Sequence, residues 1–154
     1  MSSAGDVNSD GIADLIIGAS HASPNGNASG RSYVVFGKST GFSPTLNLLD
    51  INGANGFTIN GIAGDGSGDS VSSAGDVNDD GITDLIIGAY GASPNGFQSG
   101  RSYVVFGKRT GFSPTFNLSS LNGANGFTIN GIAGESSSHS VSSAGDVNGM
   151  ASLT

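Results

Sequence analysis

Two short acidic segments contain the residues of this chain whose types and spacing could do chemistry. In one of them, Asp76, Asn78 and Asp80 place oxygen-bearing side chains at alternate positions, and a glycine follows directly. A hard cation such as Ca2+ requires several oxygens in a flexible loop, and glycine tolerates the backbone angles of the tight turn that brings them together. The backbone carbonyl of Ile82 and the carboxylate of Asp84 would complete the set. The spacing therefore predicts a calcium-binding loop.

The same loop occurs 70 residues earlier in the chain, at residues 6–14. The proposed ligands have the same types and spacing in both copies, whereas a position that needs no ligand differs, with Ser9 in one and Asp79 in the other. A third copy begins at Asp146 and leaves the pattern after Asn148. A plain turn with carboxylates facing water is the alternative, and the repetition favours the metal loop. The predicted ligands are Asp6, Asn8, Asp10, Ile12, Asp14, Asp76, Asn78, Asp80, Ile82 and Asp84.

An EF-hand is the other calcium site that starts with this spacing, but it needs a glutamate at the twelfth loop position and a helix on each side. Ile87 stands at that position here. Residues 85–89 form a short apolar run rich in β-branched side chains, which predicts a buried strand. The loop is therefore expected to join two strands.

Composition favours a soluble all-β protein. The chain has 154 residues, 27 of them glycine, and no apolar run approaches the roughly 20 residues of a membrane span. Its net charge of −7 argues against nucleic acid as a partner, and half of its twelve acidic residues are proposed metal ligands. The absence of cysteine excludes disulfides and thiolate metal sites. No signal peptide is recognised, yet the weak calcium affinity of extracellular modules suggests an extracellular or cell-surface location.

Each 70-residue unit is expected to form four strands. A small-residue strand at 71–75 leads into the loop, an apolar strand at 84–89 follows, and an aromatic and β-branched strand occupies 101–107. The fourth strand alternates apolar and polar residues, as at 56–62. A four-stranded unit repeated at a fixed period is typical of a β-propeller blade, and β-solenoid coils are much shorter.

We therefore predict an all-β fold of β-propeller blades, each with four antiparallel strands, and two blades in the chain. The boundaries are expected at 1–70 for the first blade and 71–140 for the second. Residues 141–154 would contain a spare innermost strand of a third repeat and a truncated tail.

The chain resembles the FG-GAP repeats of integrin α-subunit β-propellers and their bacterial relatives. The resemblance rests on Ala-Gly-Asp-Val-Asn-Asp-Asp-Gly-Ile-Thr-Asp-Leu-Ile-Ile-Gly-Ala at 74–89 and on Tyr-Val-Val-Phe at 103–106, and it covers both repeats. It implies Ca2+ in the loop between the first and second strands of each blade, in an extracellular module for adhesion or ligand binding. The family's Phe-Gly before the innermost strand is Ser67-Gly68 here, so packing between blades is expected to differ while the metal loop is kept.

Two blades cannot close a ring, because propellers typically have about 4–8. Exposed blade faces and sheet edges would remain. Either the chain is part of a longer array, or copies associate, with trimers giving six blades and tetramers eight. We expect self-association, because the spare innermost strand could pair with another copy.

A binding role is favoured over catalysis. His21 and His139 are each replaced in the other repeat, and no nucleophile motif accompanies the serines. Arg31 and Arg101 recur and are expected to pair with a carboxylate or a turn carbonyl at a strand edge. The chain is predicted to be a non-enzymatic module for cell-surface adhesion or protein-ligand binding. The alternatives are a carbohydrate-binding propeller and a metal-dependent hydrolase, and the loop has no histidine to support the latter.

Overall fold

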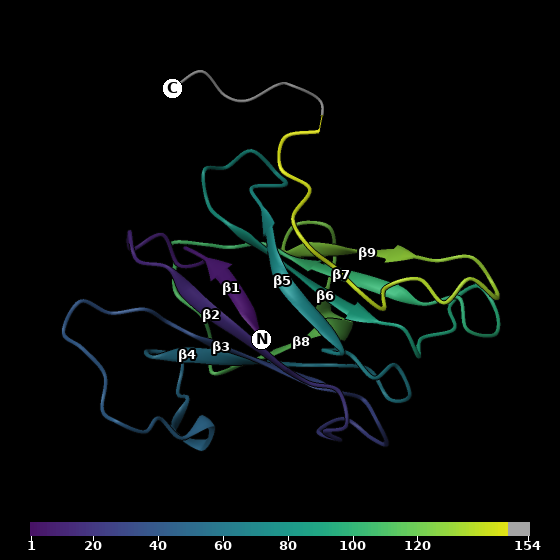
Figure 1. Cartoon of the computed structure of the whole chain (residues 1–154), viewed down its shortest axis with the longest axis horizontal. Coiled ribbons are helices and arrows are strands. Elements are labelled where there is room, and N and C mark those ends of the chain that lie inside the picture. Colours follow the sequence, from purple (N-terminus) through teal and green to yellow (C-terminus); the bar gives the residue numbers. More distant parts are fainter. Residues whose placement is uncertain (148–154) are drawn as a thin grey trace.

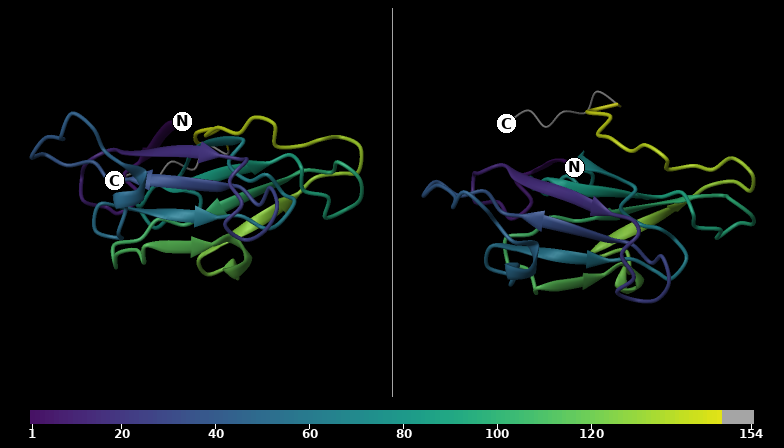
Figure 2. Two further views of the ribbon diagram at one scale, coloured as in Figure 1. Left: turned by 90° about the horizontal axis from the view of Figure 1, so that it is seen from below. Right: turned by 60° about the horizontal axis from the view of Figure 1, so that its bottom comes forward.

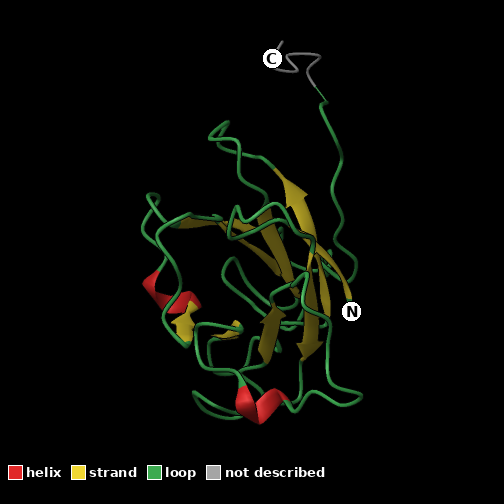
Figure 3. Ribbon diagram, turned by 90° about the vertical axis from the view of Figure 1, so that its left-hand side faces the viewer, coloured by secondary structure: helices red, strands yellow, loops and turns green. Residues whose placement is uncertain are grey.

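The computed structural model describes residues 1–147 and folds them into two twisted β-sheets (Figure 1). The two short 3-10 helices lie at the periphery (Figure 3), and no helix within 1–147 has the length and apolar character needed to cross a membrane. The predicted all-β fold with two propeller-type sheets is confirmed. The elements are β1 Ser2–Gly5, β2 Asp14–Ala19, β3 Arg31–Val35, η1 Leu48–Asp50, β4 Gly56–Asn60, β5 Ser70–Gly75, β6 Asp84–Ala89, β7 Arg101–Val105, β8 Thr115–Asn117, η2 Leu118–Ser120 and β9 Gly126–Asn130.

Each repeat builds one antiparallel sheet in chain order. The first sheet runs β1-β2-β3-β4 and the second runs β5-β6-β7-β9. Their registers are the same, since Ile16 opposes Val34 in the first sheet and Ile86 opposes Val104 in the second. The first strands of the two sheets, β1 and β5, lie side by side near the centre of the molecule (Figure 1). This is the arrangement of neighbouring propeller blades.

The first sheet has a fifth strand that the sequence did not predict. Strand β8 comes from the second repeat, between β7 and β9, and pairs in parallel with β4 (Figure 2). The backbone N–H of Thr58 donates to the carbonyl of Pro114 at 2.9 Å, just before the paired residues begin. The second repeat therefore covers the outer edge of the first sheet, which protects an edge that would otherwise be open.

The hydrophobic core lies between the two sheets. We call the side of each sheet that carries the first and third residues after the loop aspartate the leading face, and the opposite side the trailing face. The trailing face of the first sheet packs against the leading face of the second. Leu85 on the buried leading face is 0% exposed, whereas its counterpart Leu15, on the leading face of the first sheet, is 47% exposed. The equivalent positions are Leu15, Ile17 and Tyr33 in the first sheet and Leu85, Ile87 and Tyr103 in the second.

The third-repeat segment lies against the trailing face of the second sheet but is not a strand up to residue 147. The N–H of Val141 donates to Ser70 Oγ at 2.9 Å, and the hydroxyls of Ser102 and Ser138 are 2.6 Å apart. The segment occupies the place of a next first strand, because a β-carbon on Gly88 would meet the Ser138 carbonyl as one on Gly18 would meet that of Gly68. A first strand forms its ladder hydrogen bonds with the second strand of its own sheet. The described residues end at 147, before a second strand of the third repeat, so the segment forms no ladder within them. Asn148 and the predicted tail at 149–154 lie outside the described residues.

Candidate functional site

The two acidic loops connect the first and second strands of each sheet, β1 to β2 and β5 to β6. Each begins at an irregularity in the strand pairing, next to Gly5 and Gly75. The glycine at the sixth loop position has a φ of 85° in the first loop and 81° in the second, which is the left-handed region that favours glycine. The expected tight turn is therefore present. Sequence reasoning missed that the fourth position, Ser9 or Asp79, is also left-handed, with a φ of 59°.

Two side chains of the first loop accept the same backbone N–H, and a third side chain is hydrogen-bonded to one of them. The N–H of Asp10 donates to Asp6 Oδ1 at 2.9 Å and to Asn8 Oδ1 at 3.1 Å. The other Asp6 oxygen accepts the N–H of Gly11 at 2.8 Å, and Asn8 Nδ2 donates to Asp10 Oδ2 at 3.0 Å. These contacts fold the loop back on its own start, so that carboxylate and carboxamide oxygens lie close together.

The second loop repeats this network with the same atoms. Asp76 Oδ1 and Asn78 Oδ1 accept the N–H of Asp80 at 3.1 and 3.2 Å. Asp76 Oδ2 accepts the N–H of Gly81 at 2.8 Å, and Asn78 Nδ2 donates to Asp80 Oδ2 at 3.1 Å. The local sequence therefore encodes the loop shape, because it forms in both surroundings even though the second loop is the more exposed.

The ninth-position aspartates have a different setting. Asp14 and Asp84 are buried, and each carboxylate accepts two backbone N–H groups from different parts of its sheet. For Asp84 these donors are Val77 at 2.8 Å and Gly107 at 2.9 Å. Burial raises the pKa of both carboxyls, and the nearby loop carboxylates add to the rise, although the two hydrogen bonds act in the opposite direction. The carboxylate thus joins the loop start to the end of the third strand.

The structure brings together the residues at the first, third and fifth loop positions. Each loop gathers two carboxylates and one carboxamide, and no three Asp, Glu, His or Cys side chains within 1–147 form a metal-binding group by themselves. The ninth-position carboxylate lies near enough to the others to interact electrostatically with them. Carboxylate, carboxamide and carbonyl oxygens are the donor types that Ca2+ takes from proteins, so the chemistry of the set fits that ion.

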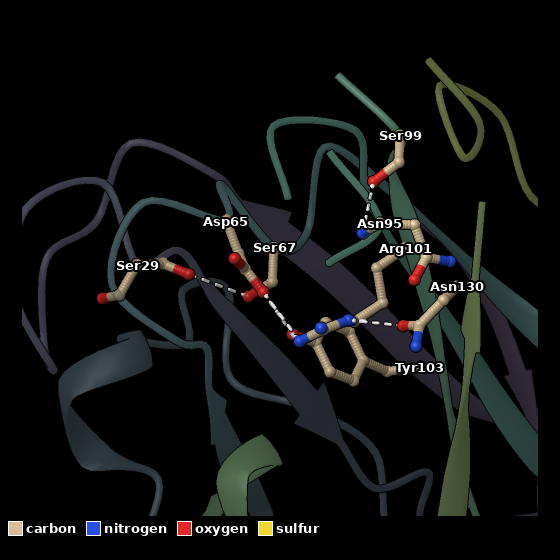
Figure 4. A network of polar contacts seen from close by, with 8 residues as sticks. All are labelled: Ser29, Asp65, Ser67, Asn95, Ser99, Arg101, Tyr103 and Asn130. Carbon is tan, nitrogen blue, oxygen red and sulfur yellow. Dashed lines mark hydrogen bonds and ion pairs between the residues drawn. The ribbon is translucent and has the colours of Figure 1, made fainter. Parts of the chain in front are cut away.

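A polar cluster, which sequence reasoning missed, joins the two sheets (Figure 4). Asp65, in the loop between β4 and β5, accepts a hydrogen bond from the Tyr103 hydroxyl and lies 3.6 Å from Arg101 Nη1. Arg101 also donates to Tyr103 Oη at 3.2 Å and to Asn130 Oδ1 at 2.9 Å. Burial and the Asp65 carboxylate raise the pKa of Tyr103. The expectation that Arg101 pairs with a carboxylate is confirmed, and its counterpart Arg31 donates to Asn60 at 2.8 Å.

Replacing Tyr103 with phenylalanine is expected to lower the free energy of unfolding by about 1.5–3 kcal/mol, because it removes a buried hydrogen bond to a charged group. Tyr33→Phe is the matched control, since Tyr33 occupies the same position in the first sheet and is only partly buried. Urea unfolding of both variants measures the difference. Equal losses would contradict a special role for the Asp65 contact.

The two histidines lie apart from the acidic loops. His21 is exposed and its Nδ1 is 3.5 Å from Ser20 Oγ, and His139 stacks on Tyr90 with ring centroids 4.4 Å apart. Both contacts are those of surface loop residues.

The fold and the loops define a class of protein: propeller-type sheets with an Asp-x-Asn-x-Asp-Gly loop after each first strand. The FG-GAP repeat model matches residues 2–35 and 67–105, one match in each sheet. Each of the two sheets therefore contains an FG-GAP repeat. Integrin alpha-IIb of Mus musculus is 39% identical over 90 residues, which is 58% of this chain and 8% of the integrin. The chain thus spans less than a tenth of the length of this relative.

Proposed function

We propose that the chain is a calcium-stabilised, non-enzymatic integrin-like module that binds a protein ligand outside the cell or at its surface. The observation that carries the proposal is the acidic loop, which has the same hydrogen-bond network in both FG-GAP repeats. Similarity to an integrin α subunit supports a binding role over a catalytic one.

The residues that would hold the ion are the ten predicted from the sequence. Asp6, Asn8 and Asp10 would supply side-chain oxygens and Ile12 its carbonyl, with the equivalent residues in the second loop. The buried carboxylate of Asp14 would also coordinate the ion, in addition to accepting its two backbone N–H groups. Each carboxylate oxygen has a second lone pair, so these bonds leave room for a cation. Bound Ca2+ would offset the repulsion among the carboxylates and fasten β1 to β2.

Replacing Asp76 with alanine is expected to remove most of the stabilisation that calcium gives to the second loop. At concentrations about 10–100 times a weak dissociation constant, one bound ion contributes roughly 1.4–2.7 kcal/mol. In chelator the loss should be smaller, about 0.5–1.5 kcal/mol, because only the hydrogen bonds to Asp80 and Gly81 are lost. Thermal unfolding in millimolar calcium and in chelator measures both values.

Asp79→Ser is the matched control for this test. It removes the same charge from the same loop and introduces the residue that the first loop has at this position, Ser9. It should leave the calcium effect unchanged, and calorimetry should still give two sites per chain. Equal losses for Asp76→Ala in calcium and in chelator would contradict the site.

A glycan array tests the choice of ligand class. A protein-binding module should give no saturable signal there, whereas binding to one defined glycan class would overturn the proposal in favour of a carbohydrate-binding propeller. The array is read once in calcium and once in chelator, so that the folded, ion-loaded chain is compared with its chelated form.

A further inference from the structure

We propose that the trailing face of the second sheet binds the leading face of the first sheet of a second copy of this chain. The contact between the two sheets within one chain is the pattern for this interface. Ile59, on the trailing face of the first sheet, is 0% exposed, whereas its counterpart Ile129 is 50% exposed. Val77 and Ile132 are also exposed, whereas their first-repeat counterparts Val7 and Ile62 belong to or pack against the core. Leu15 is exposed on the leading face of the first sheet. Each uncovered face carries the residue types that are buried at the internal junction.

The outer edge of the second sheet lacks the strand that the first sheet has. β4 pairs with β8, whereas β9, with the same sequence as β4, has no neighbour on that side within the described residues. The segment 44–47 is the first-repeat counterpart of the stretch that contains β8, and it is exposed and outside any strand. In the second copy this segment pairs in parallel with β9, as β8 pairs with β4, which satisfies an open sheet edge.

Two aromatic rings stack at the internal junction, and their counterparts in the other repeat lie on the two uncovered faces. Phe112 stacks on Phe57 with ring centroids 4.0 Å apart and an interplanar angle of 3°. Their counterparts are Phe42, which is exposed near segment 44–47, and Phe127, which lies on β9. Docking of the second copy brings Phe42 onto Phe127.

Charge is complementary between the two faces. Glu135 of the second repeat stands at the position of Asp65, and it is exposed. Arg31 and Tyr33 stand at the positions of Arg101 and Tyr103, which hold Asp65 in the internal junction (Figure 4). Glu135 of one copy therefore meets Arg31 and Tyr33 of the next.

The third-repeat segment gives the interface its innermost strand. Residues 142–147 repeat the sequence of residues 2–7, and the residues just before them, Ser138 and Val141, already contact the second sheet. In the assembly this segment takes the place of β1 in the second copy's first sheet, with Ser142 opposite Ile16 as Ser72 is opposite Ile86. The incoming strand repeats the sequence of β1 and keeps the pairing with β2, while β1 itself is released. Three or four copies would give six or eight sheets, within the usual range of about 4–8.

Cysteine cross-linking tests the interface directly, because the chain has no cysteine of its own. The Thr58 and Thr115 hydroxyls are 3.3 Å apart at the internal junction, and the corresponding residues between copies are Thr128 and Thr45. A mixture of the Thr128→Cys and Thr45→Cys proteins should form a reducible, disulfide-linked dimer that neither protein forms alone. Thr58→Cys with Thr115→Cys in one chain is the positive control and should cross-link without a change in mass.

Charge reversal at Glu135 and Arg31 then tests the recognition. Adding Glu135→Lys to the Thr128→Cys protein should lower the cross-linking yield, and adding Arg31→Glu to the Thr45→Cys protein should restore it. Asp69→Lys, an exposed reversal at the internal junction, should leave the yield unchanged. The reactions are run in calcium and in chelator, so that a failed metal site is distinguished from a failed interface.

The proposal is overturned if the mixture stays unlinked while the internal control cross-links. It is also overturned if light scattering finds only monomer at every concentration, in which case another protein or further repeats cover these faces. The mass expected from light scattering is three or four times that of one chain.

Discussion

Replacing Leu85 with alanine is expected to lower the free energy of unfolding by about 2–5 kcal/mol. Leu85 is fully buried between the sheets, in one cluster with residues of both repeats such as Ile16 and Tyr103. The variant loses the transfer free energy of the side chain and leaves a cavity that the two rigid sheets cannot close. Urea denaturation followed by circular dichroism measures the change in midpoint.

Leu15→Ala is the control that the repeat itself supplies. Leu15 follows the loop aspartate in the first repeat as Leu85 does in the second, but about half of its surface is exposed. At low protein concentration its replacement should cost much less, because no other sheet covers it. If a second copy docks on this face, the loss from Leu15→Ala grows with protein concentration. Equal losses for the two variants at low concentration would contradict packing of the second sheet on the first.

The repeat period made the main elements predictable. The apolar run after each loop aspartate became β2 and β6, and the Tyr-Val-Val run became β3 and β7. These strands are predictable because local β-branched composition and packing requirements agree. Comparison of the two repeats also marked which loop residues do not vary.

Contacts between repeats were not predictable from the period. β8 forms only because the second repeat lies beside the β4 edge, and its counterpart at 45–47, with a similar sequence, is not a strand. The role of Asp65 was not predictable either, because its partners, Arg101 and Tyr103, lie in the neighbouring sheet. Its counterpart Glu135 is exposed. Sequence-based reasoning describes one repeat at a time, whereas these features belong to the junction between two.

The role of the ninth loop position also needed the structure. Spacing alone placed Asp14 and Asp84 with the other proposed ligands. The structure shows that their carboxylates bond to backbone N–H groups from two parts of the sheet, whereas those of Asp6 and Asp76 bond only within the loop. The ninth position therefore has a structural role that does not depend on an ion.

Replacing Asp84 with alanine is expected to destabilise the chain by roughly 2–5 kcal/mol in chelator, where its hydrogen bonds and side-chain volume are lost, and by more in calcium, where a proposed ligand is lost as well. The N–H groups of Val77 and Gly107 both lose their acceptor, and the one on Gly107 is buried. An unsatisfied buried donor costs about 1–3 kcal/mol, and the cavity left by the side chain adds to this. Thermal unfolding in both conditions, beside Asp76→Ala, measures the two losses.

Asp84→Asn separates the hydrogen bonds from the charge. The amide keeps one acceptor oxygen but turns its NH2 group toward the second backbone N–H, so an intermediate loss is expected, again in both conditions. For Asp76→Ala the larger part of the loss should instead appear only when calcium is present. A loss for Asp84→Ala confined to calcium would mean that the carboxylate acts through the ion and that the two N–H groups find other acceptors. Loss in both conditions, together with a weaker calcium effect, would show that one carboxylate both closes the sheet and holds the ion.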